Sequence, residues 1–575
     1  MQGVDYTTLV ASCHELQTHW VPAKVEQVHQ RDRYTLCLSL RTVKKRVWLI
    51  ISWHPQAARL CIGDAPPRVP DTFTFSDQLR HQLNGLALIS IQLHSEWERV
   101  VELQFAQRPQ DSKQWSVFVE VMNKYSNVIL ANADGQIVTA AHQVSSKQSS
   151  LRAIQTGDLY SLPPKRFSSI PKSEETFKDW KENIQLVPKP LTKAINQVYS
   201  GLSSALLNML LQQADIPVKS HTTELSKQQW QDLYQQWQWW LTQLRDQQFT
   251  PIVTEQGYSV LGANQNTEPT DISISQLLTA YYEPKLNQQT FTQLKHQLIQ
   301  CIQSKLKKLK HKEQDFESKL AGVGKAESFR EKADLLMAYL HEWQPGMKSI
   351  QLNSFIDGKP CAIPLNPELN AVQNAQAFYK KHQKIKRSKD FIEPLLKDVQ
   401  SEIQYLEQVD DAIQVQDIYR DEIDLITLQE IRDELVQQGY LSLLDHRKPQ
   451  DTGVNYRSFL TPNEFQVFVG RNNKQNDHLT FRTAGQYDLW FHAQEISGSH
   501  VLLRLDAGAN VEEKDLLFCA NIAAYFSRAR QSDQVPVIYT QPRYVFKPKG
   551  AKPGMTVYTH ETVLWGQPKK VELSV

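Results

Sequence analysis

Residues 294–310 read LKHQLIQCIQSKLKKLK, and their leucine and isoleucine side chains recur every three or four residues. That spacing places the apolar side chains on one face of a helix. A later stretch keeps the same spacing, with Ile392, Leu396, Val399, Ile403, Leu406 and Val409. Residues 343–373 contain several prolines and glycines, so one continuous helix is excluded. The sequence therefore predicts two long helices, about residues 285–342 and 368–440, folded back into an antiparallel coiled-coil arm.

Three further segments surround this arm, which we assign to residues 276–450. Residues 1–170 alternate short apolar runs with turn residues, which is typical of a mostly antiparallel sheet with a few helices. Residues 171–275 favour short helices, and the alternating pattern returns over residues 451–575. The sequence therefore predicts an α+β multidomain protein, because a chain of 575 residues is too long for one core.

Four tryptophans, Trp230, Trp237, Trp239 and Trp240, lie in one glutamine-rich stretch of the second segment. Tryptophans at helical spacing are more typical of packing than of nucleobase stacking. Packing is therefore the favoured interpretation, and stacking is the alternative.

The sequence also argues against several classes of protein. Its six cysteines form no Cys-x-x-Cys pair, so neither a disulfide framework nor a structural zinc site is predicted. P-loop, dinucleotide-binding, H-E-x-x-H and G-x-S-x-G motifs are absent, which favours a binding protein over an enzyme and predicts no catalytic residue, cofactor or metal. No apolar run approaches the roughly 20 residues of a membrane helix, and no signal peptide is evident. We therefore expect a cytoplasmic protein.

Charge points to local rather than global binding of nucleic acid, because the net charge is only +2. Two runs contain basic residues and no acid: Lys305, Lys307, Lys308, Lys310 and Lys312, and then Lys380, Lys381, Lys384, Lys386, Arg387 and Lys389. Exposed helices usually mix both signs, so solvation alone is the weaker explanation. In an antiparallel hairpin the runs could lie at a similar level and form one basic flank. We favour contact with RNA phosphates.

The pair Glu98-Arg99 precedes an apolar strand. With a period of two, Arg99 shares a face with Val101, Leu103 and Phe105. An arginine on an apolar face needs a partner, so it belongs to a buried ion pair or lies at the strand end and reaches into a cleft. The residues alone favour a structural role.

A second cluster comprises Asp488, Trp490 and His492, which face the same way on a predicted strand. A carboxylate, an indole and an imidazole could form a base-recognition surface. Alternatively, the tryptophan is packed and its neighbours satisfy one another by hydrogen bonds. His492 and His500 lack an evident third ligand for a metal.

The C-terminal segment resembles a known RNA-binding domain. Residues 469–477 (VGRNNKQND), 488–492 (DLWFH), 498–501 (GSHV) and 523–530 (AAYFSRAR) resemble the signature of the NFACT-R domain of the NFACT family. Residues 124–130 (KYSNVIL) and 157–164 (GDLYSLPP) resemble landmarks of its NFACT-N domain, and residues 363–367 (IPLNP) resemble the head of its coiled-coil arm. The resemblance covers nearly the whole chain.

Membership would imply a mixed α/β NFACT-N domain for tRNA at residues 1–170, a helix-hairpin-helix-like domain at 171–275, the arm at 276–450 and NFACT-R at 451–575. It would imply a ribosome-associated quality control factor that binds large (50S) subunits carrying peptidyl-tRNA. Such factors recruit charged tRNA, alanyl-tRNA in bacteria, for mRNA-independent C-terminal tailing of the trapped chain. The arm would reach toward the protein at the stalk base, and an Hsp15-like RNA-binding protein is an expected partner.

The resemblance also assigns residues. Glu98 and Arg99 fall at the family's Asp-Arg pair for tRNA, and Asp5 matches an N-terminal acidic position. The NFACT-R motif comprises Asp488, Trp490, His492, Arg471 and Asn472. Three positions depart from the family pattern: glutamate replaces aspartate at position 98, Asn123 replaces glycine and Ser497 replaces proline.

Two alternatives remain. Relatives carry a fibronectin-binding label, which would fit a surface adhesin, although the lysine runs suit RNA better. A glycosylase-related nucleic-acid-binding protein is disfavoured, because the chain begins Met1-Gln2-Gly3 without the N-terminal proline nucleophile, and it lacks a four-cysteine cluster.

Overall fold

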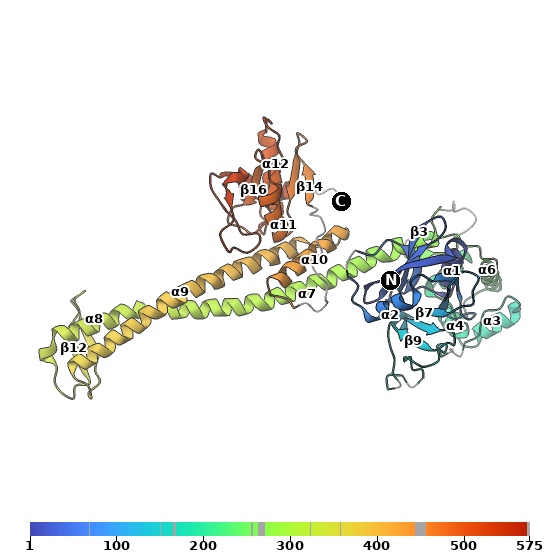
Figure 1. Cartoon of the computed structure of the whole chain (residues 1–575), viewed down its shortest axis with the longest axis horizontal. Coiled ribbons are helices and arrows are strands. Elements are labelled where there is room, and N and C mark those ends of the chain that lie inside the picture. Colours follow the sequence, from blue (N-terminus) through green and yellow to red (C-terminus); the bar gives the residue numbers. More distant parts are fainter. Residues whose placement is uncertain are drawn as a thin grey trace. The chain divides into compact units, whose positions relative to one another are not determined.

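The computed structural model describes residues 1–67, 70–145, 147–149, 151–164, 168–254, 257–262, 271–321, 324–356, 358–442 and 456–571. Within those ranges it divides into two compact units, residues 1–289 and residues 290–571. Helix α7 (Ile274–Ala321) begins in the first unit and ends in the second (Figure 1). In the part of the chain described, no helix is both long and apolar enough to cross a membrane.

The first unit is built on a nine-stranded antiparallel sheet with the order β4-β3-β2-β1-β5-β6-β7-β8-β9. The strands are β1 (Ala23–Asp32), β2 (Thr35–Arg41), β3 (Arg46–Ser52), β4 (Arg59–Gly63), β5 (Ala87–Leu93), β6 (Val100–Ala106), β7 (Trp115–Glu120), β8 (Asn127–Asn132) and β9 (Ile137–Ala140). Side chains alternate between two faces: in β6, Val101, Leu103 and Phe105 join the larger core, while Val100 joins a smaller one.

Helices cover the larger core. They are α1 (Tyr6–Trp20), α2 (Thr74–Leu83), α3 (Phe177–Gln185), α4 (Leu191–Val198), α5 (Ser204–Gln213) and α6 (Lys227–Arg245), followed by the hairpin β10 (Ile252–Thr254) and β11 (Gly257–Ser259). Trp230, Trp237 and Trp240 of α6 are each at most 1% exposed, and Trp239 packs partly buried against the same core. The packing interpretation of the tryptophans is therefore confirmed.

The second unit contains the helical arm. Helix α7 continues into it, followed by α8 (Gly324–Ala338), the hairpin β12 (Ser349–Asn353) and β13 (Pro360–Pro364), α9 (Ala371–Val415) and α10 (Glu422–Gln437). Leu294, Leu298 and Ile302 of α7 share a core with residues 405–413 of α9, and the outer end of α9 packs on α8. The predicted coiled-coil arm is confirmed, although its first helix begins at Ile274 instead of 285, and its second ends at Val415 before α10.

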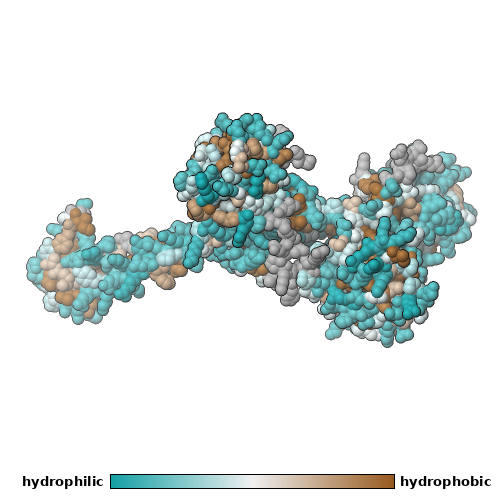
Figure 2. Space-filling view, turned by 45° about the horizontal axis from the view of Figure 1, so that its top comes forward, coloured by the Kyte–Doolittle hydropathy of each residue, from teal (hydrophilic) through white to brown (hydrophobic). Residues whose placement is uncertain are grey.

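The ends of the arm differ in surface character. Figure 2 shows a mostly hydrophilic arm with hydrophobic atoms at the end formed by α8 and the β12–β13 hairpin. There the loop residues Phe355 and Ile356 are 58% and 82% exposed.

The C-terminal part of the second unit is a six-stranded antiparallel sheet with the order β14-β15-β17-β16-β18-β21. Its elements are β14 (Arg457–Leu460), β15 (Gln466–Val469), α11 (Asn473–His478), β16 (Leu489–Ala493), β17 (Val501–Leu503), α12 (Glu513–Tyr525), β18 (Val535–Thr540), β19 (Val545–Phe546), β20 (Val557–Tyr558) and β21 (Thr562–Gly566). Short helical turns are η1 (Asn123–Tyr125), η2 (Leu340–Glu342), the π-helix η3 (Leu479–Thr483), η4 (Pro542–Tyr544) and η5 (Pro568–Lys570). Helix α12 covers one sheet face, and η3 and the β19–β20 hairpin cover the other.

A buried carboxyl group links α10 to α9. Glu434 is 4% exposed, and its Oε1 accepts a hydrogen bond from the Tyr405 hydroxyl at 2.7 Å. Burial raises the pKa of Glu434 to about 7, because the ionised carboxylate is poorly solvated there. The hydrogen bond from Tyr405 opposes this shift and only partly offsets it.

We predict that Glu434→Gln stabilises the second unit at pH 8. The folded pKa of Glu434 lies above its unfolded value, so stability is fully present below about pH 4.5 and falls as pH rises toward 7. Glutamine keeps the Oε1 acceptor and removes this loss, which is worth about 3 kcal/mol for a pKa raised from 4.5 to about 7. Denaturant unfolding at pH 5 and pH 8 measures the difference. The control Glu317→Gln, at an exposed position on α7, should leave the pH dependence unchanged. A lower stability of Glu434→Gln at pH 8 would contradict the prediction.

Candidate functional site

Asp5 closes the N-terminal end of α1. Its Oδ1 accepts a hydrogen bond from the Thr8 main-chain N–H at 2.8 Å, and its Oδ2 accepts one from the Ser203 hydroxyl at 2.5 Å. Ser203 Oγ also accepts from the Leu206 N–H and so caps α5. Asp5 is 7% exposed, and its two oxygens join the N-terminal ends of two helices. A contact between Asp5 and tRNA stays a prediction.

Trp97 anchors the loop that carries Glu98 and Arg99. Its indole stacks on Tyr6 with ring centroids 4.6 Å apart and meets Trp240 edge-on at 5.6 Å. The backbone of Trp97 has φ +60, a conformation that a bulky residue adopts only when packing holds it. Gly201 makes room for the indole, since a Cβ there would lie 2.9 Å from a Trp97 ring carbon. Helices α1 and α6 therefore fix the position of this loop.

Glu98 and Arg99 follow Trp97 directly, and both side chains are half-buried. Arg99 Nη1 donates a hydrogen bond to the Val4 carbonyl at 3.4 Å, and the Arg99 carbonyl accepts one from the Val121 N–H at 2.9 Å. The guanidinium thus lies at the end of β6, beside the start of α1. Its strand neighbours Val101 and Leu103 are fully buried.

The turn after β7 borders this region. A Cβ on Gly3 would lie 3.4 Å from Asn123 Oδ1, and Asn123 has φ +51. Asparagine tolerates this left-handed conformation better than most side chains, so the turn forms without a glycine at position 123. The Lys124 ammonium lies 4.9 Å over the ring of Tyr125, which is 72% exposed. This turn follows Val121, whose main-chain N–H bonds to the Arg99 carbonyl, and its cation and aromatic face suit phosphates and bases of RNA.

Sequence reasoning used Lys124 and Tyr125 only as landmarks and overlooked Trp97. Its signal in the sequence was faint, namely one tryptophan in a polar loop before Glu98-Arg99. Tyr6, Gly201 and Trp240, which complete the packing, lie far away along the chain.

In the C-terminal domain, Trp490 is fully buried, and its indole N–H donates to the Thr480 hydroxyl at 3.0 Å. His492 stacks on it at 5.7 Å, and burial lowers the pKa of His492 to about 4. The buried His500 shares the same Thr480 hydroxyl at 2.7 Å. Of the two interpretations of this cluster, the packed tryptophan is the one that the structure supports.

Asp488 is 1% exposed, and its carboxylate joins the main chain at Gly485 to the main chain at Leu505. Its Oδ2 accepts from the Gly485 N–H at 2.7 Å, and its Oδ1 accepts from the Leu505 N–H at 3.0 Å. Arg504 Nη1 lies 3.5 Å from Oδ2. The carboxylate of the motif therefore fixes a loop and does not face solvent.

Arg471 and Asn472 lie where α11 meets α10. Asn472 caps α11, and its Nδ2 donates to Glu430 Oε2 at 2.7 Å. Burial lowers the pKa of Arg471, and the nearby carboxylates of Asp421 and Asp424 offset this shift only in part. These two motif residues therefore serve the junction between the arm and the sheet domain.

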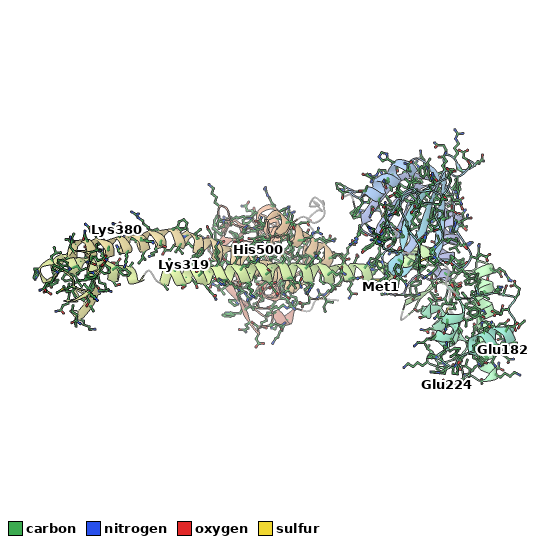
Figure 3. The ribbon with its side chains drawn as sticks, turned by 90° about the horizontal axis from the view of Figure 1, so that it is seen from below. Met1, Glu182, Glu224, Lys319, Lys380 and His500 are labelled. Carbon is green, nitrogen blue, oxygen red and sulfur yellow. The ribbon has the colours of Figure 1, made fainter. Side chains whose placement is uncertain are left out.

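The basic runs are exposed but do not form one flank. Lys310 pairs with Glu407 at 2.6 Å, whereas His382 lies 3.5 Å from Glu327. Along α9 these levels are 25 residues apart (407 − 382), or about 35–40 Å at 1.5 Å per residue. The prediction of a shared level was wrong, because the antiparallel register aligns Lys310 with residue 407. Figure 3 shows Lys380 toward the end of the arm where α8 lies.

The two basic runs therefore make separate patches. The inner patch comprises Lys305, Lys307, Lys308, Lys310 and Lys312, and the outer patch comprises Lys380, Lys381, Lys384, Lys386, Arg387 and Lys389.

Comparison with known proteins agrees with this architecture. Residues 455–558 match the family model described as NFACT protein RNA binding domain, so the chain is a multidomain protein with a domain of this RNA-binding class. Residues 5–452 match the model described as NFACT N-terminal and middle domains. The chain belongs to the NFACT family.

Relatives cover nearly all of the chain. A protein of Streptococcus suis (strain 05ZYH33) named Rqc2 homolog RqcH is 31% identical over 563 residues, covering 96% of this chain and 95% of that protein. Its namesake in Bacillus subtilis (strain 168) is 27% identical over 570 residues, covering 96% of each. A solved structure of the C-terminal part of the fibronectin/fibrinogen-binding protein from Streptococcus suis is 31% identical, with a TM-score of 0.38, covering 49% of this chain and 96% of that one.

We predict that Gly201→Ala destabilises the first unit through Trp97. Gly135 is a matched control, because its φ of +80 is close to the +81 of Gly201 but nothing lies within 4 Å of a Cβ there. Gly135→Ala should lower the free energy of unfolding by about 1–2 kcal/mol, because only backbone strain is added. Gly201→Ala should cost a further 1–3 kcal/mol or so, because the indole must move. Denaturant unfolding measures both variants, and equal losses would show that Trp97 tolerates the methyl group.

Proposed function

We propose that this chain is a ribosome-associated quality control factor. In this proposal it binds stalled large (50S) ribosomal subunits that carry peptidyl-tRNA, and it recruits charged tRNA, alanyl-tRNA, for mRNA-independent C-terminal tailing of the nascent chain. The observation that carries the proposal is the 31% identity to the Rqc2 homolog RqcH over 96% of this chain.

The geometry supports separate roles for the two units. Arg99 offers a positive charge on the loop that Trp97 anchors, and Lys124 and Tyr125 offer a cation and an aromatic face on the turn after β7; both suit tRNA recognition. The inner and outer patches suit rRNA phosphates at two points along the arm. Peptide bond formation would belong to the ribosome, so we propose no catalytic role for the chain itself. We place this activity in the cytoplasm. The proposed protein partners are the protein at the stalk base of the large subunit and an Hsp15-like RNA-binding protein.

We predict that Arg99→Ala lowers the recovery of tRNA at least tenfold while large-subunit rRNA is retained. The guanidinium supplies a charge-assisted contact that alanine cannot replace, whereas the arm still binds the subunit. The measurement is affinity purification of the tagged protein from cells, followed by sequencing of the bound RNA. Arg245→Ala removes an exposed arginine that pairs with Asp246 and serves as the control.

Three results would contradict parts of the proposal. Recovery of large subunits without an enriched tRNA would support the proposed ribosome binding but contradict the proposed role in tailing. Unchanged tRNA with Arg99→Ala would remove the assigned residue. Absence of ribosomal RNA would remove the proposal itself and favour a surface adhesin, which exposure of the protein on intact cells would test.

We also predict that Lys305, Lys307 and Lys308, all changed to glutamine, weaken subunit binding in a salt-dependent manner. Three lost phosphate contacts should lower the slope of log affinity against log salt by about 2–3. Co-sedimentation with purified large subunits at several salt concentrations measures the slope. Lys310→Gln is the comparison, because the Lys310 ammonium already pairs with Glu407 and should contribute least. A slope unaffected by the triple change would exclude the inner patch from rRNA contact.

A further inference from the structure

One corner of the C-terminal sheet presents aromatic side chains beside arginines. In β15, Val467 and Val469 face α12, so Phe468 faces the opposite side of the sheet, where it is half-buried. The guanidinium of Arg504, which follows β17, lies 5.7 Å over the Phe468 ring. This corner lies beside the chain segment that joins α11 to β16.

That joining segment turns two aromatic side chains and one arginine toward solvent. Its π-helix η3 buries Leu479 and Thr480, which are 0% and 4% exposed, and leaves Phe481 38% exposed. Arg482 follows and is exposed as well. Tyr487, in the turn after the π-helix, is 52% exposed. We call Phe481, Arg482 and Tyr487 the aromatic–arginine surface.

Hydrogen bonds hold this segment in place. Arg504 Nη2 donates to the Thr483 carbonyl at 3.1 Å, and its Nη1 lies 3.5 Å from Asp488. The Tyr456 hydroxyl lies 2.8 Å from the Thr483 hydroxyl. The turn is thus fixed on both sides of Tyr487, so little conformational freedom remains to be lost on binding. Arg504 and Asp488 are positioning residues in this arrangement.

The charge of the segment favours an anionic ligand. Between residues 478 and 488 the acidic side chain is Asp488, which is 1% exposed and already bonded to Gly485 and Leu505. Arg482 supplies an exposed positive charge next to Phe481. Aromatic faces with an adjacent arginine suit an unpaired nucleotide, whose base stacks while its phosphate accepts hydrogen bonds from the guanidinium.

We propose that the aromatic–arginine surface binds single-stranded RNA, with unpaired bases stacked on Tyr487 and Phe481 and a neighbouring phosphate bound by Arg482. The inference rests on the RNA-binding role in the proposed function and names the ligand and the residues for the C-terminal domain. Buried Trp490 is not part of the contact, although it belongs to the recognised motif.

The test measures binding of the full chain to a labelled oligoadenylate of about ten nucleotides, by fluorescence anisotropy, and to a duplex RNA of the same length. Tyr487→Ala and Phe481→Ala should each weaken binding of the single strand about 5- to 150-fold, the loss expected for one base–aromatic stack. Tyr487→Phe should bind within about twofold of the parent, because it keeps the ring. Duplex binding should not change, since its bases are already stacked.

Trp565→Ala is the control, because Trp565 is a 58% exposed aromatic residue on β21 of the same sheet. An unchanged unfolding midpoint shows that each variant is folded. Failure of the parent to bind the single strand, unaltered binding by the Tyr487 and Phe481 variants, or an equal loss with Trp565→Ala would each overturn the proposal. A loss of large-subunit binding with unchanged oligonucleotide binding would also overturn it and indicate a protein partner.

The oligonucleotide assay contains no ribosome, so its outcome is separable from the proposed function. A parent chain that binds the oligonucleotide through Tyr487 but recovers no large subunits would keep this inference and remove the ribosomal role. A parent chain that recovers large subunits but does not bind the oligonucleotide through Tyr487 would contradict this inference and leave the ribosomal role intact.

Discussion

Contact of the Trp97 indole with Tyr6 and Trp240 is the constraint on which the first unit's candidate site depends. It joins the sheet, α1 and α6 at one point, and it holds the backbone of the loop at a positive φ. Asp5 and Ser203 reinforce the same junction by capping two helices and bonding to each other. Arg99 is therefore held in a fixed position, so little conformational entropy would be lost from this loop if a ligand bound there.

Patterns of local origin were readable from the sequence. Apolar spacing predicted the arm, and alternation placed Val101, Leu103 and Phe105 on one face of β6. The tryptophans of α6 were correctly expected to pack. These predictions succeed because each depends on periodicity within a single element.

Features that depend on contacts between distant residues were not readable in this way. A repeat of threes and fours predicts that two helices pair, but a slip by one heptad preserves the apolar seam. The positions of the two lysine runs along the arm therefore could not be predicted from the repeat. They follow from the register of the paired helices, in which Lys310 faces Glu407. Trp97 illustrates the same limit, because its partners are residues 6, 201 and 240. Likewise, the alternation of side chains along residues 488–492 predicted the sheet face on which Asp488 lies. It could not predict the ion pair of Asp488 with Arg504, which follows a different strand.

The separation of the inner and outer patches has a consequence for avidity. Paired helices hold the two patches at a set spacing of about 35–40 Å, so in the proposed function the arm would bind as a bivalent ligand with a stiff spacer. A target with phosphates at both points gains the product of two modest affinities at high effective concentration, whereas free RNA fragments engage one patch at a time. The arm could thus discriminate a large folded RNA from abundant short ones by distance alone, without reading a single base.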